Sequence, residues 1–155
     1  MFKTILGSIT DSKEKYICHQ TNCVSTGPGG GLARTIFNTY PWSDIYQTRI
    51  KRDKLGSIIV RGNGDDERFV INMNAQYYPG QPNFENDLIE DRAIGFQKCL
   101  NEISKIENLT SIAFPARIGC AIAGGDWDEY YQMIKDFAAK LNNVDVIIYD
   151  YENKY

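Results

Sequence analysis

Residues 16–37 read YICHQTNCVSTGPGGGLARTIF, and this stretch decides the fold. It begins with a β-branched and aromatic run typical of a buried strand, passes through the glycine-rich segment 27–31, and ends in a pattern of helical period. Glycines in such a loop allow positive φ and let a ligand lie directly against backbone amides. A flexible turn is the alternative interpretation of a single glycine cluster.

Residues 111–127, SIAFPARIGCAIAGGDW, repeat the order of strand, glycine loop and helix. The loop from Gly119 to Gly125 is expected to present several unpartnered N–H groups beside a helix N-terminus, where the macrodipole adds positive potential. In open α/β sheets, ligands collect beyond the carboxyl ends of the strands. The two loops together therefore predict one cleft that holds an extended ligand containing phosphate.

Other short apolar runs predict further strands, and stretches of helical period lie between them. The expected strands are 2–6, 15–19, 57–61, 68–73, 111–114 and 145–149, and the expected helices are 31–40, 43–53, 87–106 and 127–141. Ser43 and Asp126 are the expected N-caps of the second and fourth helices. The segment 62–67 predicts a hairpin turn, and 76–86 a loop rich in Pro, Gly and Asn. Strands interleaved with helices indicate an α/β domain with a mostly buried sheet.

Composition bounds the class of protein. The chain has 155 residues, 43% of them hydrophobic and 24% charged, which predicts one domain over residues 1–155. A net charge of −3 and a pI of about 5.2 disfavour binding to a nucleic acid backbone. No uncharged apolar run approaches the ~18 residues that span a bilayer, and the first residues lack the apolar core of a signal peptide. A cytoplasmic location without membrane contact is expected, with a monomer as the default state.

The sequence gives no sign of a metal or a cofactor. His19 is the only histidine, and the cysteines, which are expected to be reduced thiols, lack metal-ligand spacing at Cys18, Cys23, Cys99 and Cys120. Neither glycine loop contains Gly-Lys-Ser/Thr or the spacing G-x-G-x-x-G. ATP hydrolysis and hydride transfer are therefore poor hypotheses.

The most specific motifs are HQTNC at 19–23 followed by GGGLA at 29–33, and Pro115 with IGCAIAGGDW at 118–127. Together they resemble a macrodomain, the ADP-ribose-binding module, over essentially the whole chain. The resemblance is to the branch that contains the ADP-ribose 1″-phosphate phosphatases and the enzymes that remove ADP-ribose from glutamate, with similar stand-alone copies in viruses and phages. It implies an α/β three-layer sandwich, in which a mixed six-stranded sheet lies between helices.

The resemblance also implies which residues bind the ligand. Asn22 falls where macrodomains place an Asn against the distal ribose, residues 29–31 would flank that ribose, and residues 119–125 would wrap the pyrophosphate. Tyr149 falls where an aromatic stacks on adenine, with an ordinary strand aromatic as the alternative. The expected ligand contacts are Ser8, Ile9, Asn22, Gly29, Gly30, Gly31, Leu32, Gly119, Cys120, Ala121, Ile122, Ala123, Gly124, Gly125 and Tyr149.

The chain departs from the family pattern at several positions. Ser8 stands where many macrodomains have an Asp that binds the adenine amino group, and a serine supplies no charge there. Ala33 replaces the Asp of the mono-ADP-ribosyl hydrolase branch. The lysine and aspartate of the glutamate-deconjugating enzymes have no counterparts in 36–39 and 121–123. Covalent lysine chemistry is therefore disfavoured.

Three residues are candidates for catalysis: His19, Asn22 and Asp126. An imidazole at the mouth of the first loop could act as a general acid or base, or hold a water for attack on a phosphate. A structural histidine is the alternative, because a shift of one strand residue would turn the ring away from the ligand. Helix capping explains Asp126 without any catalytic role. Further polar contacts to the distal ribose could come from Asn74, Gln76 or Tyr77.

The expected function is binding of ADP-ribose and hydrolysis of the terminal phosphate of ADP-ribose 1″-phosphate, without a metal or cofactor. One alternative is a reader that binds ADP-ribose and performs no reaction. Another is an ADP-ribosyl hydrolase that acts on protein or nucleic acid. Phosphate release, measured beside binding of ADP-ribose, separates the first two.

Overall fold

The computed structural model describes residues 1–65, 67–83 and 85–151. They form a six-stranded sheet in the order β1-β6-β5-β2-β4-β3. The strands are β1 (Phe2–Leu6), β2 (Tyr16–Asn22), β3 (Ile58–Gly62), β4 (Phe69–Gln76), β5 (Ser111–Pro115) and β6 (Asp145–Asp150). Neighbouring strands are parallel except β3 and β4, which are antiparallel. The predicted mixed α/β sheet is therefore confirmed.

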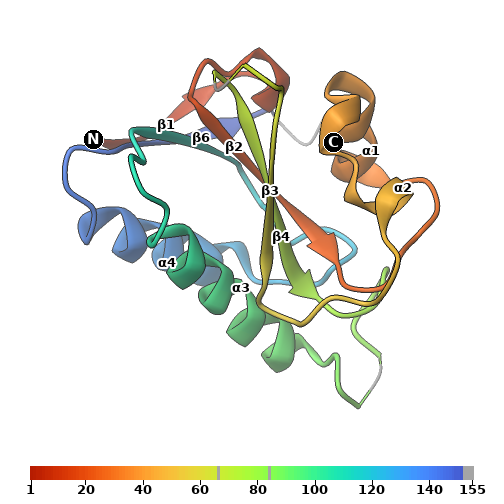
Figure 1. Cartoon of the computed structure of the whole chain (residues 1–155). Helices are drawn as coiled ribbons and strands as arrows, with labels where there is room; N and C mark the ends of the chain where they lie inside the picture. The colour runs from red at the N-terminus through yellow and green to blue at the C-terminus, as the bar shows by residue number, and fades with distance from the viewer. Residues whose placement is uncertain (66, 84, 152–155) are drawn as a thin grey trace.

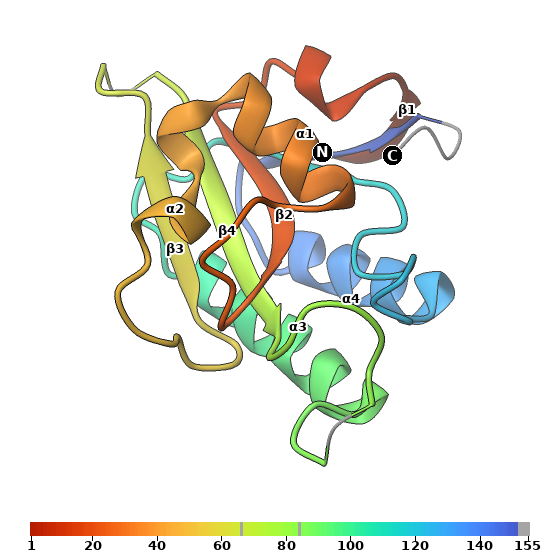
Figure 2. The same ribbon diagram turned by 90° about the vertical axis from the view of Figure 1, so that its right-hand side faces the viewer.

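Helices cover both faces of the sheet (Figures 1 and 2). One face carries α1 (Gly31–Thr39) and α2 (Ile45–Thr48), whose apolar side chains share a buried cluster with β2 and β6. The other face carries α3 (Ile89–Ile103) and α4 (Trp127–Ala139), which enclose a larger cluster. Short 3-10 turns span Ile9–Asp11 and Pro41–Ser43. The result is a three-layer arrangement.

The central strands are buried on both faces, which explains their composition. Ile112, Ala113 and Phe114 of β5 are all fully buried, as are the six residues from Val70 to Ala75 in β4. β5 accordingly shows a continuous apolar run instead of an alternation of apolar and polar residues. β4 also contains two buried polar residues, Asn72 and Asn74, whose side-chain amides are hydrogen-bonded. Such runs locate a strand in the sequence but leave the facing of each side chain open.

The expected helix over 43–53 is wrong. A 3-10 turn ends at Ser43, and α2 covers only Ile45–Thr48. The N-cap is Asp44, whose Oδ1 accepts hydrogen bonds from the backbone N–H groups of the second and third residues that follow it. Ser43 instead donates to the carbonyl of Tyr40 at 2.6 Å. The chain leaves the helix early, and Arg49 is extended at its C-cap.

The third helix begins at Ile89, two residues later than expected. Leu88, inside the expected range, is the N-cap and is 46% exposed. The buried face of the helix carries Phe96, Cys99, Leu100 and Ile103, all fully buried. The expected turn at 62–67 and loop at 76–86 each include a position, 66 and 84, outside the described residues.

The structure also bears on the cysteines and on membrane spanning. Cys18, Cys23, Cys99 and Cys120 are all free thiols. In the described ranges, the helices are too short or too polar to cross a bilayer.

Candidate functional site

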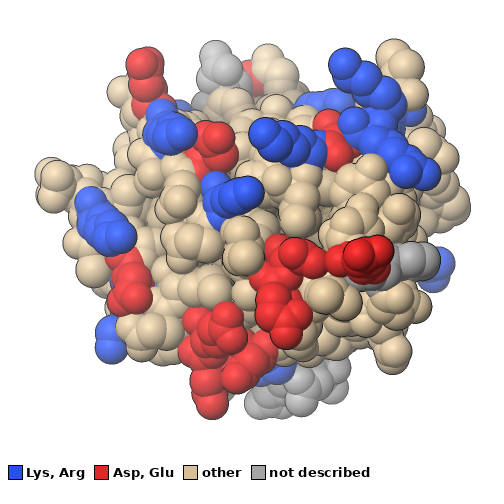
Figure 3. Space-filling view, turned by 90° about the horizontal axis from the view of Figure 1, so that it is seen from below, with Lys and Arg blue, Asp and Glu red and all other residues tan. Residues whose placement is uncertain are grey.

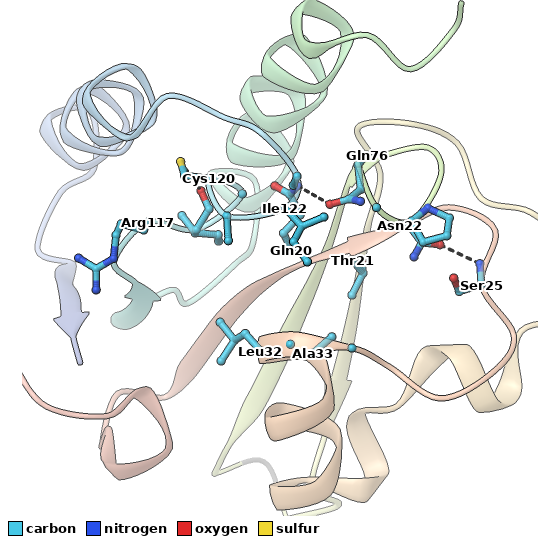
Figure 4. Close-up of a pocket in the computed structure, with 18 of the residues that line it drawn as sticks. Gln20, Thr21, Asn22, Ser25, Leu32, Ala33, Gln76, Arg117, Cys120 and Ile122 are labelled. Carbon is cyan, nitrogen blue, oxygen red and sulfur yellow. Dashed lines mark hydrogen bonds between the residues drawn. The ribbon is translucent and has the colours of Figure 1, made fainter. Parts of the chain in front are cut away.

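A cleft of about 650 Å³ lies beyond the carboxyl ends of β2, β4 and β5 (Figure 4). Its walls are the end of β2, the start of α1, the loop after β5 and the segment after β4. Figure 4 shows Arg117, Cys120 and Ile122 on one side, and Leu32 and Ala33 of α1 on the other. The volume is in the range of sites that hold a ligand of the size of a dinucleotide or a drug.

The loop after β5 presents backbone donors to this cleft. Within it, Cys120 N–H bonds to Arg117, Gly124 N–H to Ala121, and Gly125 N–H to the Gly119 carbonyl. Among the described residues, no acceptor pairs with four further backbone N–H groups, all from residues that line the cleft: those of Gly119, Ala121, Ile122 and Ala123. Several unpartnered amides along one short loop suit an anion such as a phosphate.

Glycines permit the path of this loop. Gly119 has φ +74°, and a Cβ there would lie 2.5 Å from Oε1 of Gln20. A Cβ on Gly125 would lie 2.6 Å from the Gly119 carbonyl oxygen. Gly124 has φ +84°, and its Cβ would meet Pro82. Neither Gly124 nor Gly125 lines the cleft, so these two residues shape the loop from behind.

The start of α1 is the opposite wall. Its N-cap, Gly30, offers no side chain to the first turn, and the N–H groups of Gly31, Leu32 and Ala33 have no acceptor within the described part of the chain. All four residues line the cleft. Gly29 does not, because it is buried against α1, where a Cβ would lie 3.2 Å from the Arg34 nitrogen. Two sets of free amides therefore face one cavity.

Asn22 lines the cleft at the end of β2, and its side chain organises the first loop. Its Oδ1 accepts hydrogen bonds from the N–H groups of Val24 at 3.0 Å and Ser25 at 2.8 Å. The backbone N–H and Nδ2 of Asn22 both donate to the hydroxyl of Tyr46, at 2.9 and 3.1 Å. Arg49 fixes the same loop by donating to the carbonyls of Asn22 and Ser25, both at 2.9 Å.

A pair of amide side chains lies between β2 and β4 at the cleft. Gln20 Nε2 donates to Gln76 Oε1 at 2.8 Å, and Gln76 in turn donates to the Tyr78 carbonyl at 2.9 Å. Gln20 Oε1 is buried and has no partner among the described atoms. Gln76 was expected as a contact to the ribose, and it does line the cleft, whereas Asn74 and Tyr77 do not.

His19 lies on β2 but does not line the cleft. Its ring is fully buried, with an edge-on contact to Phe37 of α1 and a hydrogen bond from Nε2 to Asn72 Oδ1 at 2.6 Å. Asn72 Nδ2 donates to two carbonyls, so its Oδ1 must accept, and Nε2 carries the ring proton. Nδ1 has no partner among the described residues. Burial lowers the pKa of His19 to about 4, against a smaller raising effect of the bond to Asn72.

Asp126 is the N-cap of α4, as the sequence predicts. Its Oδ1 accepts a hydrogen bond from the Asp128 N–H at 3.0 Å. The side chain is exposed and is not part of the cleft lining. The structure therefore separates the three proposed catalytic residues, and only Asn22 reaches the cavity.

Three other expected ligand contacts, Ser8, Ile9 and Tyr149, also lie outside the cleft. Ser8 caps the first 3-10 turn through its Oγ, which accepts from the Thr10 N–H at 3.2 Å. Ile9 is fully buried in the core on the α1 side. Tyr149 belongs to the same core, and its hydroxyl donates to the carboxylate of Glu14. Burial, together with Glu14, raises the pKa of Tyr149 to about 12.

A buried ion pair stands behind the cleft. Arg92 of α3 and Asp87 are 1% and 0% exposed, and Nη2 lies 2.6 Å from Oδ2. The same carboxylate accepts the backbone N–H groups of Tyr77 and Tyr78 at 2.9 and 3.0 Å. Burial opposes ionisation, but the bonds from Arg92 and from these amides outweigh it and lower the pKa of Asp87.

The Arg92 guanidinium also ties two walls of the cleft together. Its Nη1 donates to the carbonyls of Gly80 at 2.7 Å and Ala123 at 3.1 Å, both on residues that line the cavity. Gly80 belongs to the segment after β4, and Ala123 to the loop after β5. One side chain therefore sets the spacing of two segments that are far apart in sequence.

Charge is unevenly placed around the molecule. On the face seen from below, several Asp and Glu side chains gather at the centre and below it, while Lys and Arg side chains are more frequent in the upper half of the view (Figure 3). In the cleft, the charged lining residue is Arg117, which donates to Asp150 at 2.8 Å. No group of three or more His, Cys, Asp or Glu in the described ranges is arranged to hold a metal ion. Attraction of an anionic ligand therefore depends mainly on backbone donors.

Of the expected ligand contacts, those that line the cleft are Asn22, Gly30, Gly31, Leu32, Gly119, Cys120, Ala121, Ile122 and Ala123. Sequence reasoning missed several others, among them Gln20, Thr21, Ser25, Tyr46, Gly80 and Arg117. Gln20 and Thr21 lie inside the same HQTN motif, directly after His19. Tyr46 carries no local signal, because only the packing of α2 against the end of β2 brings its hydroxyl to Asn22.

No protein-family model and no curated protein matches the chain. Solved structures do match this chain. The macrodomain of Thermus aquaticus DarG is 24% identical, with a TM-score of 0.74 over 96% of this chain and 97% of that one. A protein of unknown function from Bacteroides thetaiotaomicron is 26% identical, with a TM-score of 0.74 over 97% and 98% of the two chains. Thermosipho africanus DarTG in complex with ADP-ribose is 18% identical, with a TM-score of 0.70 over 99% of this chain and 43% of that one.

The fold and the cleft together define an α/β sandwich in which backbone amides from two loops face one cavity. More specifically, this chain has the macrodomain fold, as its sequence resemblance implies.

Proposed function

We propose that the protein is a member of the macrodomain family and that its cleft binds ADP-ribose. The observation that carries this proposal is the two facing sets of unpartnered amides, in the loop after β5 and at the start of α1. A pyrophosphate satisfies several donors at once, and an uncapped helix N-terminus adds positive potential. The solved complex of Thermosipho africanus DarTG with ADP-ribose, on the same fold, supports this choice of ligand.

The proposed reaction is hydrolysis of the terminal phosphate of ADP-ribose 1″-phosphate. Donors at fixed positions stabilise the charge that spreads over the phosphoryl oxygens during transfer, and this term can supply most of the catalysis. His19 takes no direct part in this scheme, because its ring is buried on the α1 side of the sheet. Asn22 would orient the distal ribose, and water would be the nucleophile.

A reader that only binds ADP-ribose is the second candidate, and one observation favours it. The titratable side chains that line the cleft are Tyr46, Arg117 and Cys120. Burial raises the pKa of both Tyr46 and Cys120 to about 12. Neither the Tyr46 hydroxyl nor the Cys120 thiol therefore ionises near neutral pH, where a general base works best.

Two measurements on the same sample test these proposals. Calorimetry with ADP-ribose is expected to show binding, with ADP as a weaker ligand that lacks the distal ribose. Phosphate release from ADP-ribose 1″-phosphate then separates enzyme from reader. An absence of ADP-ribose binding by folded protein would refute the proposed function, and binding without phosphate release would leave the reader.

A further inference from the structure

Tyr46 lies in the cleft but has no role in the proposed reaction. It lies on α2, is 4% exposed and lines the cavity next to Asn22. Its ring is fixed by an edge-on contact with Phe37 and by the Arg49 guanidinium, 5.3 Å from the ring centroid. The hydroxyl therefore has little freedom to move.

The hydroxyl of Tyr46 can still donate one hydrogen bond. A phenolic hydroxyl has one hydrogen to donate and lone pairs that accept. The hydroxyl of Tyr46 already accepts two hydrogen bonds from Asn22, one from the backbone N–H and one from Nδ2. Within the described residues no acceptor receives its own O–H. Burial raises the pKa of Tyr46 to about 12, so this hydrogen is retained at neutral pH.

The side chain of Asn22 likewise has only a hydrogen-bond donor left for a ligand. The orientation of its amide is fixed, because Oδ1 accepts from two backbone N–H groups and cannot be exchanged with Nδ2. With Oδ1 occupied and one Nδ2 hydrogen bonded to Tyr46, the amide retains one N–H for a ligand. Tyr46 and Asn22 thus offer hydrogens and no lone pair.

We propose that Tyr46 is a specificity-determining residue that donates its hydroxyl hydrogen to an oxygen at the distal end of the ligand, and that with Asn22 it selects an acceptor-rich substituent such as a phosphate at the 1″ position. This inference rests on the proposed function and adds a preference for the chemical group at the distal end of the ligand. A phosphate carries several acceptor oxygens and no obligatory donor, whereas a free hydroxyl must also place its own hydrogen. Charge-assisted bonds to a phosphate are the stronger of the two kinds.

The test uses Tyr46→Phe, which keeps the ring and removes the hydroxyl. Three ligands are titrated by calorimetry: ADP, ADP-ribose, and an ADP-ribose 1″-phosphonate that resists hydrolysis. Wild type is expected to prefer the phosphonate over ADP-ribose by about tenfold or more. Tyr46→Phe is expected to leave ADP affinity within about twofold and to weaken the phosphonate by roughly 10- to 100-fold. Tyr131→Phe, which removes a hydroxyl from α4 outside the cleft, is the matched control.

A double-mutant cycle separates direct contact from an indirect effect on Asn22. In the Asn22→Ala background, Tyr46→Phe is expected to cause a further loss of phosphonate affinity, because the hydroxyl meets the ligand itself. No further loss would mean that Tyr46 only positions Asn22, and would overturn the inference. So would a folded Tyr46→Phe protein that keeps the full preference for the phosphonate.

Wild-type measurements cover the case in which Tyr46→Phe does not fold. Equal affinities of wild type for ADP-ribose and the phosphonate would overturn the inference without any variant. Failure of the proposed function looks different, since wild type would then bind none of the ligands that carry the distal ribose.

Discussion

At the scale of single residues, His19 and Gln20 show how much one position in a strand decides. Both lie in the HQTN motif, yet His19 packs against Phe37 on the α1 side while Gln20 bonds to Gln76 at the cleft. The sequence marks the motif as important but leaves the facing open, because β2 is buried on both sides and lacks a polar alternation. Only the packed structure assigns the two faces.

His19→Ala is therefore expected to affect stability more than binding. The change opens a cavity and leaves Asn72 Oδ1 without its donor, which together remove about 2–4 kcal/mol from the free energy of unfolding. Affinity of the folded protein for ADP-ribose is expected to stay within about twofold of wild type. Urea unfolding and calorimetry on one preparation check this. Normal stability with a large loss of phosphate release would instead place His19 in the reaction.

At the scale of elements, the strands can be predicted from the sequence, whereas the early end of α2 cannot. All six predicted strands are present, with boundaries shifted by at most a few residues, because β-branched runs between turn residues are a strong local signal. The segment after Pro41 has a helical period, yet it stops at Thr48. There the side chain of Arg49 bonds the carbonyls of Asn22 and Ser25, a tertiary demand that no local pattern records.

The start of α1 offers a clean test of the cleft. Gly30 has φ −116° and Gly27 lacks a positive φ, and a Cβ on either would meet nothing within 4 Å. Valine at either position is therefore expected to leave the melting temperature nearly unchanged. Gly30→Val is expected to weaken ADP-ribose by about tenfold or more, because Gly30 lines the cleft and a side chain there displaces the ligand from the amides.

Gly27→Val is the matched control, since Gly27 does not line the cleft. Calorimetry measures both variants. Equal affinity of the two would remove the first loop from the site.

Arg92 connects the segment after β4 with the loop after β5, so its replacement is expected to change the cleft. Arg92→Lys keeps the charge beside Asp87 but removes the planar fork that also reaches Gly80 and Ala123. The expected loss is about 2 kcal/mol or more of stability, with ADP-ribose affinity several-fold weaker. Arg61→Lys is the control, because among the described residues the hydrogen bond of Arg61 is to Thr48, at the exposed surface. If Arg92→Lys has the same stability and the same ADP-ribose affinity as Arg61→Lys, then Arg92 does not shape the cleft.

For the molecule as a whole, stability is expected to fall in acid through His19. Its pKa is about 4 in the folded state and 6.5 as the ordinary value, so the unfolded chain binds more protons between these pH values. Stability therefore rises with pH across this window and is flat above it. The share due to His19 is on the order of 3 kcal/mol between pH 7 and pH 4. Subtracting the unfolding curve of His19→Gln isolates it, and an unchanged difference across the window would contradict the assignment.

The whole-molecule architecture was accessible from the sequence as a class but not as an order of strands. Alternating strands and helices predict layers, and the glycine loops predict where a cleft forms. The order β1-β6-β5-β2-β4-β3 depends on long-range pairing that leaves no local trace. The same holds for the site, where the two loops were found from their glycines while Tyr46 and Arg92 needed the assembled fold.

Pairing of the first strand with the last has a consequence for how the protein is made. Among the strands that the structure describes, β1 lies at the edge of the sheet and pairs with β6, so Phe2 lies opposite Val146 and Leu6 opposite Asp150. At synthesis rates of about 5–20 residues per second, the emerging chain waits on the order of ten seconds before β1 can dock. Contacts of such long sequence separation also slow folding in a test tube. During that interval β1 has no partner strand, so its backbone N–H and C=O groups are open to pairing with another chain.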